Sequence, residues 1–171
     1  MTAIPKIKAI LRYFCANTQR PLDKIKLMNL FYFIDFEHIK HYAVPITYDR
    51  YLNLEGGPTP FTMMKKLNNV QYFPENAILA DTIKIESNGE VQSIKNFSES
   101  DKDYFSNREL GKMEKVCKRF YNASAEQIEK ASKKEAPWRE TKYGERIPYS
   151  LATLDPDCLV SKEEIELIAS L

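Results

Sequence analysis

The 171-residue chain has little of what several protein classes require. Its three cysteines, Cys15, Cys117 and Cys158, are far apart, odd in number and form no CxxC pair. A small disulfide-stapled domain or a four-cysteine zinc site is therefore excluded, and we expect buried, reduced thiols. The chain also has no uninterrupted apolar run of about 18 residues, the length that a membrane-spanning helix needs. Its first residues alternate lysine with apolar side chains instead of forming a signal-peptide core, so we expect a cytoplasmic protein.

An excess of charge of either sign is also missing. The chain has 25 basic and 24 acidic residues, and its formal net charge is +1. Non-specific nucleic-acid binding depends on lysine and arginine neutralising phosphates, so a nucleic-acid partner is not expected. One run of basic residues does occur at helical spacing, at Lys112, Lys115, Lys118 and Arg119. Glu114 lies among them and Glu109 just before them, which favours a solvated helix face.

What is present is a globular pattern dominated by helices. Apolar residues make up 43% of the chain. The spacing predicts a first amphipathic helix from Ile4 to Phe14 and a central helix from Leu22 to Tyr42, apolar on most of its circumference, with Pro21 placed for its start. Thr59 and Pro60 predict the start of another helix after an irregular connection rich in Pro and Gly.

The second half of the chain contains a hairpin signal and several helix starts. Alternation around Asn88-Gly89 predicts a β-hairpin within residues 81–95, with a two-residue turn that places Ile83 opposite Ile94. Capping boxes that begin at Ser124 and Ser161 each predict a helix. After Phe97 another helix starts either near Ser100, Asp101 and Asp103 or at a second possible capping box at Ser106. We therefore expect one α+β domain over residues 1–171, predominantly helical, in which other helices surround the central one.

No catalytic apparatus is recognisable. His38 and His41 are three residues apart on the central helix, and they are the only histidines, so a metal pair would need a third ligand that the sequence does not identify. The alternative is that both lie near the helix C-terminus, where the macrodipole favours positive charge. A Cys–His nucleophile would need an activated cysteine, and no surrounding sequence marks one. We expect no metal, no cofactor and no enzyme activity; a metal-dependent enzyme that uses His38 and His41 remains the alternative.

The polar stripe of the central helix carries the candidate contacts. Lys26, Asn29, Glu37 and Lys40 define this stripe. Phe33 falls in its gap, so another part of the chain or a partner must cover that ring. We predict that Phe33, Glu37 and Lys40 bind a partner, and we assign Trp138 and the Gly57-Pro58 turn to structure.

Three stretches resemble a known family, the Panacea or SocA-like antitoxin domain found in bacterial and prophage genes paired with toxins. They are Lys26–Phe36 leading to Pro45-Ile46-Thr47, Gly57-Pro58 after Tyr51–Glu55, and Ser124–Ile128 followed by Ser132–Trp138. Two positions depart from the pattern: Lys133 stands where the family often has histidine, and Leu54 replaces the usual aromatic residue.

The resemblance implies an antitoxin that neutralises a cognate toxin by direct binding. It also implies an adaptor role, in which the domain delivers the toxin to a protease. The expected partners are thus a toxin encoded by the adjacent gene and a protease. A DNA-binding regulator of its own operon is the alternative that many antitoxins suggest, although the sequence contains no defensible helix-turn-helix.

Overall fold

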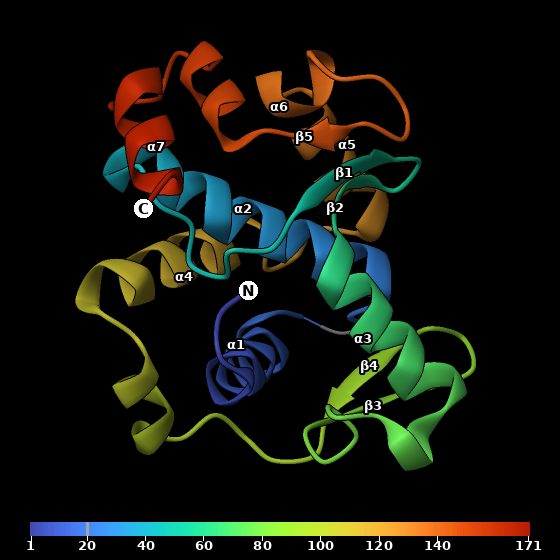
Figure 1. Cartoon of the computed structure of the whole chain (residues 1–171). Helices are drawn as coiled ribbons and strands as arrows, with labels where there is room; N and C mark the ends of the chain where they lie inside the picture. The colour runs from blue at the N-terminus through green and yellow to red at the C-terminus, as the bar shows by residue number, and fades with distance from the viewer. Residues whose placement is uncertain (20) are drawn as a thin grey trace.

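A long central helix organises the fold. The computed structural model describes residues 1–19 and 21–171. In it, α2 (Lys24–Tyr42) crosses the middle of the molecule, with α1 (Ile4–Asn17) on one side and the C-terminal elements on the other (Figure 1). Most of α2 is buried around its whole circumference, including Phe31, Phe33 and Phe36. This explains why its sequence is apolar on nearly every face.

The start of α2 differs from the prediction. The helix begins at Lys24, three residues after Pro21, because the carboxylate of Asp23 accepts a hydrogen bond from the Lys26 N–H at 2.8 Å. Such a side-chain cap satisfies one of the donors that every helix N-terminus leaves unpaired. The helix ends at Tyr42. The C-cap residue Ala43 has a left-handed φ of 65°, and its N–H donates to the Ile39 carbonyl.

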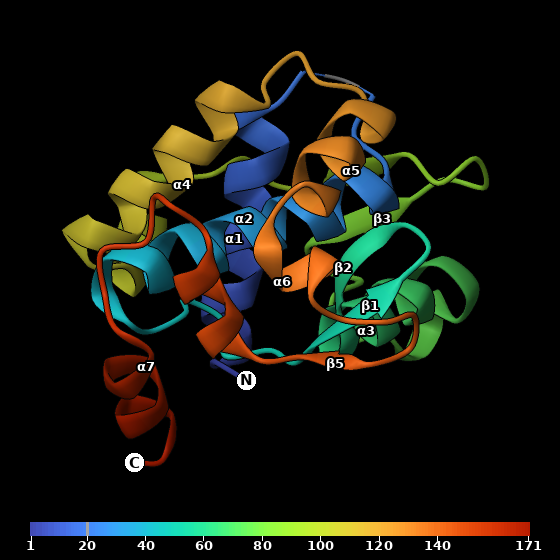
Figure 2. The ribbon, with the colours of Figure 1, turned by 90° about the horizontal axis from the view of Figure 1, so that it is seen from above.

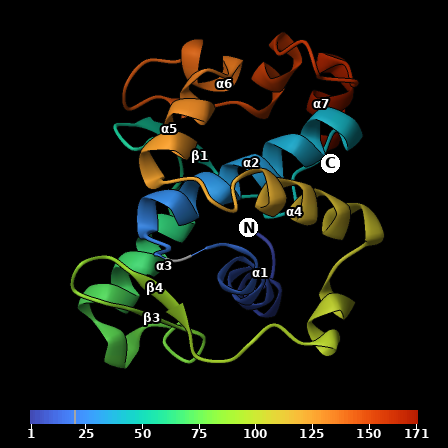
Figure 3. The same cartoon turned by 180° about the vertical axis from the view of Figure 1, so that it is seen from behind.

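Two further helices each pack against α2. These are α4 (Asn107–Arg119) and α5 (Ala125–Lys133), which Figure 3 shows in front of the central helix. The capping boxes predicted at Ser106 and Ser124 are both formed, each with its reciprocal pair of hydrogen bonds. The start at Ser124 was therefore predicted from local sequence. For α4 the structure selects Ser106 from the two starts left open, and the earlier one lies in a short 3-10 helix, Glu99–Tyr104.

The irregular connection after α2 contains a sheet that the sequence did not reveal. Strands β1 (Tyr51–Leu54) and β2 (Gly57–Pro60) form an antiparallel hairpin, and β5 (Arg146–Ile147) pairs with the other edge of β1. Pro58 and Pro60 both lie in β2, at the edge of the sheet, where a missing N–H costs least. This position explains how a strand can contain two prolines.

Helix α3 (Phe61–Tyr72) follows, but Thr59 does not cap it. The Thr59 hydroxyl donates to the Gly57 carbonyl instead. The free N–H groups of Thr62 and Met63 donate to the carboxylate of Asp49, at 3.0 and 2.9 Å. The cap of α3 is thus the side chain of Asp49, which lies 13 residues before Thr62.

The predicted hairpin is present with a different register. Strands β3 (Ile83–Ile85) and β4 (Val91–Ser93) pair so that Ile83 faces Ser93, not Ile94. The Glu86 N–H bonds to the Glu90 carbonyl, and Gly89 takes a φ of +88°. The loop therefore has one residue more than the expected two-residue turn and ends in a left-handed residue. This extra residue shifts the pairing of β3 with β4 by one position.

The remaining elements complete a predominantly helical α+β fold. They are η1 (Pro74–Asn76), η2 (Glu99–Tyr104), α6 (Ala136–Arg139), η3 (Tyr149–Leu154) and α7 (Lys162–Ala169). The box at Ser161 caps α7 as predicted. Figure 2 shows α7 at the periphery of the molecule, beyond η3. Among the described residues, no helix is long and apolar enough to span a membrane.

Candidate functional site

The three predicted contact residues on α2 are all covered. Phe33, Glu37 and Lys40 are only 1%, 5% and 1% exposed. Of the two alternatives for Phe33, cover by another part of the chain is therefore the one that the structure shows. Contact of these three residues with a partner stays a prediction, and it now requires that α4 or the C-terminal elements move away from α2.

Basic side chains of α4 provide much of that cover. The Arg119 guanidinium carbon lies 5.0 Å from the centre of the Phe33 ring, and Phe120 packs against the same ring with its centre 4.5 Å away. Lys115 Nζ lies 2.9 Å from Glu37 Oε2. The basic run of α4, interpreted as a solvated face, thus also contacts the polar stripe of α2, through cation–π contacts and an ion pair.

Lys40 is the centre of a buried ionic cluster. Its Nζ lies 3.2 Å from Glu135 Oε2, 3.2 Å from Asp155 Oδ2 and 3.1 Å from Asp157 Oδ1. Its backbone carbonyl accepts a hydrogen bond from the Leu159 N–H at 2.8 Å. One residue of α2 therefore fastens the start of α6 and the segment that follows η3.

The negative charges of this cluster favour the charged ammonium form of Lys40. Burial alone would lower the pKa of Lys40, but the negative charge of Glu135 and its neighbours outweighs burial and raises that pKa. Burial raises the pKa of Glu135, and the Lys40 ammonium opposes that change. Tyr32 donates to Glu135 Oε1 at 2.8 Å, which supplies a further hydrogen bond to the buried carboxylate. Such a cluster is stable only when all its members are present.

A second buried carboxylate fixes the connection that leaves α2. Asp35 accepts hydrogen bonds from the backbone N–H groups of Ile46 and Thr47, and from the hydroxyls of Thr47 and Tyr51. Burial raises the pKa of Asp35 to about 6, although these donors oppose the change. Together with Asp49, which caps α3, this carboxylate holds residues 44–50 in one conformation.

Gly57 and Pro58, predicted as a structural turn, are structural but begin strand β2, directly after the turn at Glu55 and Gly56. Gly57 has a φ of +112°, and a Cβ there would lie 2.8 Å from Asn29 Oδ1. The same Asn29 oxygen accepts a hydrogen bond from Ser132 at 2.6 Å. Glycine is thus required both by the backbone angle and by the close approach of α2 and α5.

Lys133 is one of the two positions that depart from the family pattern. It connects two of the stretches that resemble the family. Its Nζ donates to the Glu55 carbonyl at 2.6 Å and lies 4.9 Å from the centre of the Trp138 ring. Trp138 is partly exposed. The long lysine side chain therefore reaches the β1–β2 turn while it stacks on the indole ring.

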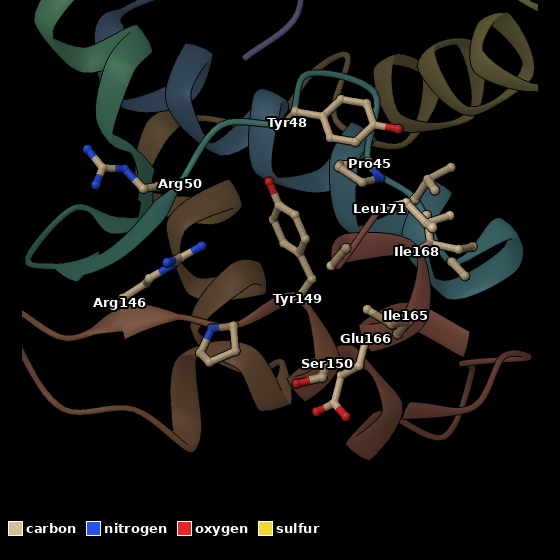
Figure 4. Close-up of a pocket in the computed structure, with 14 residues that line it drawn as sticks. Pro45, Tyr48, Arg50, Arg146, Tyr149, Ser150, Ile165, Glu166, Ile168 and Leu171 are labelled. Atoms are coloured by element: carbon tan, nitrogen blue, oxygen red, sulfur yellow. The ribbon is translucent and has the colours of Figure 1, made fainter. Parts of the chain in front are cut away.

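An open groove lies where the connection after α2 faces the C-terminal helix. Its volume is about 620 Å³. Arg50 and Arg146 line one end, and Pro45, Ile168 and Leu171 line the other (Figure 4). The Arg146 guanidinium points toward Tyr149, whereas the Arg50 guanidinium points away from it. Tyr149 stands between these ends, and Ile165 and Glu166 of α7 line the far wall. The sequence analysis missed this groove because its two walls are about 100 residues apart in the chain.

Comparison with protein families gives a match over residues 27–139, to the family described as antitoxin SocA-like, Panacea domain. The matched segment covers more than half of the chain. This chain belongs to the SocA-like Panacea family. Comparisons with curated proteins and with solved structures gave no significant match.

The Panacea match contains the central helix and the elements packed on it. It includes most of α2, from Leu27 onward, the β1–β2 hairpin, α4, α5 and α6, and it ends at Arg139. Lys40 and Glu135 lie inside the matched segment, whereas Asp155 and Asp157 lie beyond it. The groove likewise combines a wall within the Panacea match, Pro45 to Arg50, with a wall outside it.

The histidines and cysteines of this Panacea protein are not arranged as a metal centre. Among the described residues, no group of three or more His, Cys, Asp or Glu side chains could hold a metal ion. The ring of His38 bonds through Nδ1 to the Val44 carbonyl at 2.6 Å, and burial lowers its pKa. Burial raises the pKa of the Cys117 thiol to about 12, which suppresses its thiolate form.

Proposed function

We propose that this protein is a cytoplasmic antitoxin that neutralises a cognate toxin by binding it directly. The observation that carries the proposal is the match to the SocA-like Panacea family over residues 27–139. The chemistry of the described residues supports a binding role, because the polar clusters around Lys40 and Asp35 are engaged in internal contacts. Exposed aromatic and apolar side chains, among them Tyr48 at 52% and Leu159 at 73%, offer surface for a protein partner.

The alternative of a DNA-binding regulator finds less support in the arrangement of the basic residues. Arg108 and Lys112 lie over the ring of Tyr42, at 4.7 and 5.8 Å from its centre, while Lys115 pairs with Glu37. These cations contact α2, and DNA binding would require them to reach phosphates instead. We therefore keep toxin binding as the proposed function.

The test is co-expression with the product of the adjacent gene. Growth should stop when that product is expressed alone and should recover when this protein is present, and the two should co-purify as a stable complex. A harmless neighbour, or rescue without any complex, would contradict neutralisation by direct binding.

The same cells distinguish simple occlusion from an adaptor role with a protease. After protein synthesis is stopped, the toxin level should stay constant if the complex only blocks the toxin. The toxin should instead disappear faster in the presence of this protein if it is delivered to a protease. Immunoblots of the toxin with and without this protein measure the difference.

A further inference from the structure

The two arginines of the groove form a local excess of positive charge. Leu52 pairs with Arg146 across β1 and β5, and Arg50 lies two residues before Leu52, so both arginines share one face of the sheet as diagonal neighbours. Among residues 1–19 and 21–171, no carboxylate lies within ion-pair distance of either guanidinium. Arg50 instead lies 5.1 Å from the centre of the Phe61 ring.

The acidic side chain of the groove does not neutralise this end. Glu166 projects from α7 beside Ser150, on the opposite wall from the arginines (Figure 4). It lies 3.6 Å from Lys162 on the same helix. The groove is therefore polarised, with an unmatched positive end and an apolar end.

The wall between the two ends is preformed. Tyr48 has a φ of 59°, a left-handed conformation that is unfavourable for a bulky residue, and the residue is 52% exposed. The Asp35 hydrogen bonds to Ile46 and Thr47 hold the backbone on one side of Tyr48. The Tyr149 hydroxyl donates to the Asp49 carbonyl and holds the other side. A rigid wall reduces the ordering cost when a ligand binds.

We propose that this groove binds a segment of the toxin in which acidic side chains are followed by apolar ones. The carboxylates would meet Arg50 and Arg146, whose planar guanidinium groups suit carboxylate geometry. The apolar side chains would lie against Pro45, Ile168 and Leu171. This inference rests on the proposed antitoxin function and identifies the chemistry of the contact.

The first measurement compares charge-reversed variants in binding to the product of the adjacent gene. The groove variant is Arg50→Glu with Arg146→Glu. The control is Lys84→Glu with Lys95→Glu, which changes the net charge equally in the separate β3–β4 region. Both groove arginines are exposed, so the variant should keep its circular dichroism and melting temperature.

The groove variant should bind the toxin at least about tenfold more weakly, while the control should stay within about twofold of the wild type. The affinity of the wild type should also fall more steeply with salt than that of the groove variant. Leu171 is 99% exposed, so Leu171→Ser tests the apolar end and should weaken binding by about threefold without loss of stability.

Three results would overturn the proposal. If the wild type and the groove variant bind equally, the toxin lies elsewhere and the antitoxin function still stands. If the wild type itself neither binds nor rescues growth, the proposed function fails and this inference fails with it. If the groove variant abolishes self-association of this protein but leaves toxin affinity unchanged, the occupant is a second copy.

Hydrogen exchange on the wild-type complex provides a test without mutation. Binding in the groove should slow exchange in residues 44–50 and 165–171. Protection confined to other elements, such as α4 and α5, would contradict the proposal.

Discussion

Lys40 and the groove arginines are positive groups in opposite situations. Lys40 is 1% exposed and has three carboxylates within 3.2 Å of its Nζ. Arg50 and Arg146 are exposed, and no carboxylate among the described residues pairs with them. A buried charge must be matched within the fold because desolvation would otherwise oppose folding, whereas an exposed charge can be left unmatched. The difference separates the residues that stabilise this protein from those that are available to a partner.

Removing the matched charge should have the largest effect on stability. Lys40→Met keeps the length of the side chain but leaves Glu135 and Asp155 as buried carboxylates without a cation. We expect a loss of about 3–5 kcal/mol in the free energy of unfolding, as measured by urea denaturation.

The matched control is Lys115→Met. The Lys115 side chain is 58% exposed, and its ammonium group pairs with Glu37. This change should cost about 1 kcal/mol or less. Equal losses of unfolding free energy in the two variants would show that the Lys40 cluster is not a principal stabilising contact. The buried and the exposed cations would then not differ in their contribution to stability.

The packing next to that cluster should be almost as sensitive. Gly57→Ala forces a Cβ to within 2.8 Å of Asn29 Oδ1, at a φ of +112° that only glycine adopts readily. We expect a loss of about 2–3 kcal/mol in unfolding free energy. In Gly89→Ala the backbone is also left-handed, but a Cβ would meet no atom within 4 Å, so the loss should be about 1 kcal/mol. Similar losses would mean that the backbone angle alone requires glycine at position 57.

Local sequence predicted the helical part of this fold well. The capping boxes at Ser124 and Ser161 predicted two helix starts, because each box involves only four neighbouring residues. The box at Ser106 was one of two starts left open for α4. The central helix was identified over nearly its full length. Its start was predicted too early, because proline is tolerated at the first position of a helix but does not fix where the helix begins. The Asp23 side chain caps the helix by accepting a hydrogen bond from the Lys26 N–H.

Long-range contacts explain what the sequence could not predict. The strand β1 pairs with β5 more than 90 residues later, and neither segment has the alternation of a half-buried strand. The polar stripe of α2 and the basic run of α4 were each recognised, but their contact was not. Cover of Phe33 by another part of the chain was left open, but Arg119 and Phe120 were not identified as the residues that provide it. The negative charge of Glu37 on α2 and the positive charge of Lys115 on α4 could have indicated that these helices are in contact.

The smallest effect on stability should come from the groove. In Arg50→Glu with Arg146→Glu, no matched ion pair is lost, and the two side chains are exposed on one face of the sheet. The free energy of unfolding should change by only about 0.5 kcal/mol or less, in either direction. The same variant should lose most of its affinity for the toxin, so stability and binding should be separable in the groove and inseparable at Lys40. A large loss of stability in the groove variant, measured by urea denaturation, would show that these arginines belong to the fold. In that case the absence of a matching carboxylate would no longer indicate a site for a partner.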